Sequence, residues 1–415
     1  MIEFDHYHLD NGLEVILHHD PSRTVVSVNV LYRVGSRNDP PHRTGFAHLF
    51  EHLMFEGSEN VANFDDALQL AGGENNAVTS ADYTLYYDTL PADNLETALW
   101  LESDRMRKLR FSEKSLATQK KVVIEEFRET CLEQPYGDLY HHLNGLIYRT
   151  SPYRWPVIGE RFEHIEEATL DEVKAFYYRY YRPDNAILCV AGNFNPATIR
   201  EQVARWFGPI PPARKNTYYP PLPVEPRQSE FRTLTVSGDV PGHLIFLHLR
   251  TVARTHPDFP AIDILAYLLG GGRSSLLYRR LVRDTDLFTE VSAGMNDNID
   301  DGGILIEARP ADDVDLEEAR QRLFTVLEEM VDRGITREEL EKVVNQLEHR
   351  NHYRDLNISS RASELVFYAM LGQPELTNRE MDAYLAVTVE DVNRVARSYL
   401  RREVMSELLY LEEEE

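Results

Sequence analysis

Residues 45–57 read Gly-Phe-Ala-His-Leu-Phe-Glu-His-Leu-Met-Phe-Glu-Gly, and this stretch carries the strongest structural signal in the chain. Its frequent apolar residues, preceded by Thr44 and Gly45 as a possible helix start, predict a helix through both histidines. Side chains four residues apart share one helix face, so His48 and His52 would form a two-ligand claw for a transition metal. Two solvated histidines, or one histidine hydrogen-bonded in a core, are the alternatives. The apolar residues between the histidines argue against the first of these.

Glu51 stands one residue before His52 and points roughly 100° away from it around the helix axis. It cannot easily join the same coordination sphere, but it can reach a water molecule bound to the metal. In zinc hydrolases a carboxylate of this kind takes a proton from the water and later passes it to the leaving amine. The order His-x-x-Glu-His reverses the commoner His-Glu-x-x-His and resembles the inverzincin signature.

A tetrahedral catalytic zinc needs a third protein ligand and one open position. Residues 112–133 predict a long helix, because Ser112 can cap it, no Gly or Pro interrupts it, and Pro135 follows it. Spacings of three, four and three residues place four of its side chains on one face: Gln119, Val122, Glu126 and Glu129. The two glutamates are the candidates for the third ligand. A merely solvated acidic face is the alternative.

The stretch at 45–57 resembles the active-site helix of the pitrilysin family of zinc peptidases, which includes insulin-degrading enzyme and the mitochondrial processing peptidase. Residues 121–126, Lys-Val-Val-Ile-Glu-Glu, are similar to the family segment whose last glutamate is the third zinc ligand. The resemblance runs through essentially the whole chain. Gln119 departs from the family pattern, because many members carry a second functional glutamate there.

This resemblance implies a zinc metalloendopeptidase that hydrolyses extended or unfolded peptides in an enclosed chamber. One Zn²⁺ per chain would be held by His48, His52 and Glu126, with Glu129 as the alternative ligand. Glu51 would be the catalytic residue.

Between the two predicted helices, residues 72–80 and 82–87 predict a pair of strands, because a glycine pair ends a helix and β-forming residues follow. The pattern Asn-Ala-x-Thr resembles the family's edge strand, which takes up the substrate as an added antiparallel strand. The resemblance assigns substrate binding to Asn76, Ala77 and Thr79. An ordinary sheet edge is the alternative.

The 415 residues, 42% of them hydrophobic, suffice for two or more domains, and mixed helix and strand patterns predict the α+β class. Seven prolines crowd residues 208–227 and predict a semi-rigid linker between domains at 1–207 and 228–415. Each half opens with a β-rich stretch, at 24–34 and at 243–249, so an internal duplication is plausible. The family resemblance implies two related α/β-sandwich domains, each an antiparallel-rich sheet covered by helices, that form half of a clamshell.

The second half departs from self-sufficient members of the family. Residues 270–281 resemble the family's second-half glycine turn and helix, after which those members place an arginine and, seven residues later, a tyrosine. Here Val282 and Thr289 occupy the two positions, and Arg283 is the one neighbouring residue that could replace the arginine. Because such donors stabilise a developing oxyanion, we expect a heterodimer in which a related non-zinc subunit supplies the pair. A self-sufficient homodimer and a catalytically silent structural subunit remain alternatives.

The net charge of −25 argues against a nucleic-acid partner, since phosphate binding needs clustered Lys and Arg. It favours peptide substrates, basic ones among them, although solubility alone is a sufficient reason for the charge. The run at 412–415 predicts a solvated tail.

Cys131 and Cys189 lie far apart in sequence and imply no disulfide framework. Residues 1–20 lack the apolar core of a signal peptide, and no stretch approaches the roughly 18 apolar residues that span a bilayer. We therefore expect no membrane association and a cytoplasmic protein, or a periplasmic one if a leader has been removed.

Overall fold

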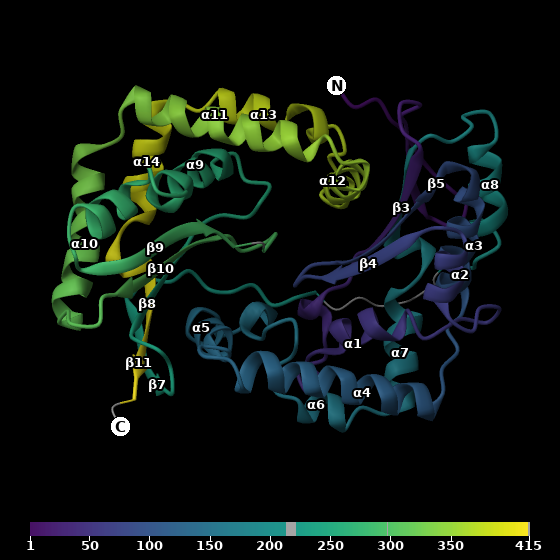
Figure 1. The fold of residues 1–415 in the computed structure, drawn as a ribbon, viewed down its shortest axis with the longest axis horizontal. Helices are drawn as coiled ribbons and strands as arrows, with labels where there is room; N and C mark the ends of the chain where they lie inside the picture. The colour runs from purple at the N-terminus through teal and green to yellow at the C-terminus, as the bar shows by residue number, and fades with distance from the viewer. Residues whose placement is uncertain (213–220, 297, 414–415) are drawn as a thin grey trace. The chain divides into compact units, whose positions relative to one another are not determined.

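The computed structural model describes residues 1–212, 221–296 and 298–413 (Figure 1). The chain forms two compact units, each assembled from three stretches of sequence. Unit 1 consists of Met1–Phe127, Trp155–Leu222 and Asn351–Arg379, and unit 2 consists of Arg128–Arg154, Pro223–Arg350 and Glu380–Glu415.

These units differ from the contiguous domains that the sequence predicts at 1–207 and 228–415, because each half of the chain contributes one stretch to the other unit. Residues 128–154 pack with the second half of the chain, and residues 351–379 pack with the first half. Part of the linker that the sequence predicts, residues 213–220, lies outside the described residues.

Unit 1 contains a six-stranded sheet in the order β1-β2-β6-β3-β5-β4. Its strands are β1 (Asp5–His8), β2 (Glu14–His19), β3 (Val25–Tyr32), β4 (Glu74–Thr79), β5 (Thr84–Pro91) and β6 (Ala186–Gly192). β2 and β6 are parallel, and every other neighbouring pair is antiparallel. The strands predicted at 24–34, 72–80 and 82–87 are therefore present, and β4 lies at a sheet edge.

The helices of unit 1 cover both faces of this sheet. They are α1 (Phe46–Leu53), α2 (Phe64–Leu70), α3 (Leu95–Arg107), α4 (Glu113–Phe127), α6 (Glu163–Glu166), α7 (Leu170–Tyr180), α8 (Ile199–Phe207) and α12 (Ile358–Met370). Short 3-10 turns lie at η1 (Ser36–Asn38), η2 (Ala92–Asn94) and η5 (Pro183–Asn185). In Figure 1, α12 comes from late in the sequence yet lies beside the sheet of the first half.

All seven residues of β6 are buried, because helices cover the strand on both sides. Strand alternation sends Leu188 and Val190 into the main core under α1, α3 and α7, and sends Ile187 and Cys189 against α12. On the α12 side, the Asn29 amide of β3 also donates to the Ser363 hydroxyl at 2.9 Å. A continuous apolar strand of this kind is stable only between two helical layers.

Unit 2 contains a five-stranded sheet in the order β7-β11-β8-β10-β9. Its strands are β7 (Arg232–Gly238), β8 (Leu244–Arg250), β9 (Phe288–Met295), β10 (Gly303–Pro310) and β11 (Met405–Glu412). Its helices are α5 (Leu139–Ile147), α9 (Phe259–Gly270), α10 (Leu316–Arg333) and α14 (Val389–Tyr399), with 3-10 turns η4 (Pro152–Arg154) and η7 (Arg402–Val404) and π-helical turns η3 (Arg128–Leu132) and η6 (Tyr278–Arg283). Two further helices, α11 (Arg337–Arg354) and α13 (Leu376–Leu385), run across the unit boundaries.

The two sheets repeat one plan, which supports the duplication suggested by the sequence. The strands β7, β11, β8, β10 and β9 have the same order and relative directions as β2, β6, β3, β5 and β4. The exchanged helix α5 lies against β7 and β11, as α12 lies against the sheet of unit 1. The predicted α+β class with two related helix-covered sheets is confirmed.

β3 of unit 1 corresponds to β8 of unit 2, and the helices that follow these two strands differ chemically. α1 follows β3 and carries both histidines, whereas α9 follows β8 and contains no His or Glu. Among the described residues, no helix is both long enough and apolar enough to cross a bilayer.

Candidate metal centre

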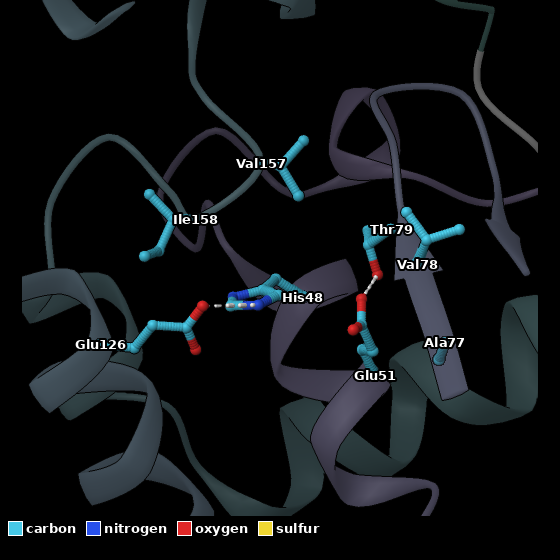
Figure 2. A pocket seen from close by; sticks show the side chains of 8 residues that line it. All are labelled: His48, Glu51, Ala77, Val78, Thr79, Glu126, Val157 and Ile158. Carbon is cyan, nitrogen blue, oxygen red and sulfur yellow. Dashed lines mark hydrogen bonds and ion pairs between the residues drawn. The ribbon is translucent and has the colours of Figure 1, made fainter. Parts of the chain in front are cut away.

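Three side chains from two helices of unit 1 converge on one point. His48 and His52 of α1 turn their Nε2 atoms toward the Glu126 carboxylate of α4, at 3.6 Å and 3.3 Å. The two imidazole rings lie 4.9 Å apart between centroids and are nearly perpendicular. Figure 2 shows His48 and Glu126 facing each other across the gap between the helices. The structure thus brings together the three residues that the family resemblance groups.

A buried carboxylate fixes the start of α1. Asp39 accepts hydrogen bonds from the backbone N–H of Gly45 at 2.7 Å and of Ala47 at 2.9 Å, so it satisfies two donors that the first helical turn leaves open. Burial raises the pKa of this carboxyl, and the backbone donors oppose the rise. The helix predicted from sequence is present, but Thr44 does not cap it, because its hydroxyl lies 2.8 Å from the His164 ring instead.

Gly45 is required by the close packing at this helix start. Its φ of +90° lies in the region that favours glycine, and a Cβ atom there would lie 2.7 Å from the Ile158 carbonyl oxygen. The loop at 156–159 therefore packs directly onto the first turn of α1.

The helix that supplies Glu126 follows the prediction closely. Ser112 caps it through the backbone N–H of Ser115, and α4 runs from Glu113 to Phe127 before the backbone changes to the π-helical turn η3. Glu129 lies in that turn and does not belong to the cluster of His48, His52 and Glu126. Gln119, two turns before Glu126 on α4, donates to the carboxylate of Glu56.

A cavity of about 300 Å³ lies beside the cluster and is lined by His48 and Glu126. Glu51 lines it as well. The Thr79 hydroxyl of β4 donates to its Oε2 atom at 2.5 Å, as the dashed line in Figure 2 marks. The sequence did not indicate this role for Thr79, which holds the carboxylate of Glu51 from the neighbouring strand.

The strand β4 passes along the cavity with Ala77, Val78 and Thr79 in its wall. Within the described residues it pairs with β5 on one side and forms the edge of its sheet on the other. Asn76 is exposed, and its side-chain oxygen accepts from the backbone N–H of Ala77 at 2.8 Å. This edge position leaves room for an added strand.

The protonation states of the cluster suit metal binding. Burial lowers the pKa of His48, and the facing carboxylates only partly oppose this shift. The hydrogen bond from His52 lowers the pKa of Glu126. A neutral imidazole and an ionised carboxylate therefore coexist at neutral pH, as ligands for a divalent cation require.

The donor types and their spacing suit a tetrahedral zinc ion. Bonds of about 2.0–2.2 Å place the ligand atoms of such a site roughly 3.3–3.5 Å apart. The two nitrogen-to-oxygen separations, from His48 to one oxygen of Glu126 and from His52 to the other, lie within a few tenths of an ångström of this range. Two imidazoles and one carboxylate also leave the fourth position open, which a catalytic zinc needs.

Sequence reasoning missed three residues that shape this centre. Val157 and Ile158 line the cavity from the loop before α6, and Asp39 anchors α1. The short apolar pair between Pro156 and Gly159 was the only signal for the loop. Nothing local marked Asp39, because it acts on a helix that begins several residues later.

In unit 2, the residues that the family resemblance aligns with its arginine and tyrosine make other contacts. Val282 packs against the core, and the Thr289 hydroxyl donates to the Arg309 carbonyl at 3.3 Å. Arg283 is exposed, and its Nε donates to its neighbour Asp284 at 2.9 Å.

Comparison with known proteins identifies the family. The family described as "Insulinase (Peptidase family M16)" matches residues 14–160, and "Peptidase M16 inactive domain" matches residues 167–347. Zinc protease PqqE of Helicobacter pylori is 32% identical over 401 residues, which cover 95% of this chain and 89% of that protein. The chain belongs to peptidase family M16. Its relatives carry the name zinc protease, which implies zinc for the M16 family.

Solved M16 structures agree with this assignment. A protease from Helicobacter pylori is 29% identical, with a TM-score of 0.93 over 99% of this chain and 100% of that chain. Pitrilysin, at 18% identity, matches 99% of this chain with a TM-score of 0.77 over 45% of its own length, and shows the shared fold. The predicted relationship to the pitrilysin family is confirmed.

The assignment of Glu126 over Glu129 can be tested by metal content. We expect Glu126→Gln to weaken zinc binding by more than about 100-fold, because loss of a direct ligand exceeds the 10- to 100-fold cost of losing a supporting group. Glu129→Gln is the matched control and should bind zinc as the wild type does. Zinc bound per chain, measured after dialysis against a zinc buffer, checks both; a loss confined to Glu129→Gln would move the ligand by one turn.

Proposed function

We propose that this chain is the zinc-binding, catalytic half of a metalloendopeptidase that cleaves extended or unfolded peptides. The observation that carries the proposal is the convergence of His48, His52 and Glu126. A cavity against a sheet edge is lined by Glu51 together with two of these ligands, His48 and Glu126. A scaffold protein has no need of a carboxylate placed in this way.

The proposed chemistry is hydrolysis of a peptide bond by water. Zinc held by the two histidines and Glu126 would lower the pKa of a bound water and polarise the scissile carbonyl. Glu51 lines the cavity next to these ligands, so its carboxylate can take the proton of the attacking water and pass it to the leaving amine. Thr79 fixes one carboxylate oxygen, which leaves the other free to receive that proton.

The proposed substrate binds as an added strand on β4. Main-chain hydrogen bonds to an edge strand recognise an extended backbone with little demand on its sequence. Ala77 and Thr79 lie in the cavity wall, and Asn76 is exposed beside them, so a peptide on this edge would pass the metal centre. The charge of −25 favours the approach of basic peptides.

We further propose that the active enzyme is a heterodimer. The positions that carry the family's arginine and tyrosine hold Val282 and Thr289, and Arg283 is already paired with Asp284. A hydrogen-bond donor aimed at the developing oxyanion is worth a few kcal/mol, so a chain without one would be a weak enzyme alone. A related subunit without the zinc motif would supply the pair.

Glu51→Gln tests the proposed catalytic carboxylate. The amide keeps the shape of the side chain but cannot take a proton, so we expect turnover to fall by at least roughly 100-fold. Zinc content should stay at the wild-type level. Hydrolysis of a quenched, unstructured peptide by the zinc-loaded protein measures the effect, and retained hydrolysis would remove Glu51 from the mechanism.

Thr79→Val and Thr79→Ser together test the role of the hydroxyl. A hydrogen bond to a charged group contributes about 1.5–3 kcal/mol, so we expect the valine variant to lose roughly 10- to 100-fold in kcat. KM and zinc content should change little, and the serine variant should keep most of the activity. A loss in the serine variant with full activity in the valine variant would show that the methyl group, not the hydroxyl, matters.

The heterodimer is tested by mixing. We expect the pure zinc-loaded chain to have low peptidase activity, which should rise strongly when a related subunit that retains the arginine and tyrosine is added. Activity of the chain alone that equals any mixture would favour a self-sufficient homodimer. Stoichiometric zinc with no activity under any condition would favour a silent structural subunit.

A further inference from the structure

A second cluster with the same donor types lies at the opposite edge of the unit 1 sheet. Among the described residues, His6, His8 and Glu14 bring one ligand atom each within 4.8 Å of one another. The two histidines sit two residues apart on β1, so they point to the same face. Glu14 on β2 is the direct cross-strand partner of His8.

The three side chains lie beside one another. The Nε2 atom of His6 lies 2.8 Å from Oε1 of Glu14, and the two imidazole rings are 5.6 Å apart between centroids. All three side chains belong to one hairpin, whose register is set by the turn at Asn11 and Gly12, with a φ of +89° at the glycine. A preformed arrangement of this kind lowers the cost of assembling ligands.

Arg33 fixes the position of the Glu14 carboxylate. The Glu14 side chain is only 9% exposed, and Arg33 contacts its Oε2 atom at 2.5 Å. Oε1 remains on the side of His6, so a cation there need not displace the guanidinium. The positive charge of Arg33 will nevertheless weaken cation binding, so this site should have a lower affinity than the one in α1 and α4.

We propose that His6, His8 and Glu14 form a second divalent transition-metal site that fastens β1 to β2 at the sheet edge. Imidazole nitrogens with a carboxylate oxygen suit Zn²⁺, and the same donors accept Cu²⁺ and Ni²⁺. The strongly negative chain raises the local concentration of cations. This site is independent of the peptidase proposal, because it shares no residue with the first cluster.

The test is the amount of zinc bound per chain. Protein stripped by a chelator is equilibrated with excess Zn²⁺ as the sole added metal, and bound zinc is measured after ultrafiltration. We expect the double variant His6→Ala/His8→Ala to bind one zinc fewer than the wild type. The control His42→Ala/His352→Ala removes two exposed histidines outside both clusters and should bind as the wild type does.

A background variant separates the two sites. In His48→Ala/His52→Ala, removal of His6 and His8 should again lower bound zinc by one per chain, whatever the first site does. Zinc should also raise Tm more in the wild type than in the chain without His6 and His8, because binding to the folded hairpin stabilises it. His6→Asn/His8→Asn, with unchanged circular dichroism, serves if the alanine variant fails to fold. Equal zinc content with and without the two histidines would overturn the proposal.

Discussion

The burial of the unit 1 sheet on both faces is the constraint on which the metal centre depends. Because β6 and its neighbours are apolar on each side, one helical layer must cover each face. α1 belongs to one of these layers and α12 to the other. The packing of this layer sets the distance between α1 and the edge strand β4. This distance decides whether the Thr79 hydroxyl can reach the Glu51 carboxylate. The geometry of the metal centre therefore rests on core packing more than on the five residues of the motif.

The duplicated plan of the two units separates scaffold from chemistry. Both sheets have the same strand order, yet α1 turns histidines and a glutamate toward a cavity, whereas α9 buries nearly all of its length in apolar core. A fold that is stable without the metal ligands can lose them in one copy at no structural cost. This asymmetry explains how one half can carry the metal ligands while the other half keeps the same fold without them.

Local patterns predicted the parts of the site that are local. The four-residue spacing of His48 and His52 is a property of one helix, so sequence alone placed both on a common face. Helical spacing alone left Glu126 and Glu129 open, and the family resemblance assigned Glu126. The structure places Glu129 beyond the change from α to π geometry and outside the cluster. Asp39 also escaped prediction, since it contacts the start of α1 from a turn several residues earlier in the sequence rather than from the adjacent cap position.

The exchange of segments escaped prediction for the same reason, because no local signal tells a helix which sheet it will cover. It also bears on how the chain could be divided. A break in the proline-rich connection would give a front piece without α12 and a rear piece without α5. Neither piece would hold a complete set of layers, so each would expose one apolar sheet face. The two pieces could fold only together, with α12 of one piece packing on the sheet of the other and α5 doing the reverse.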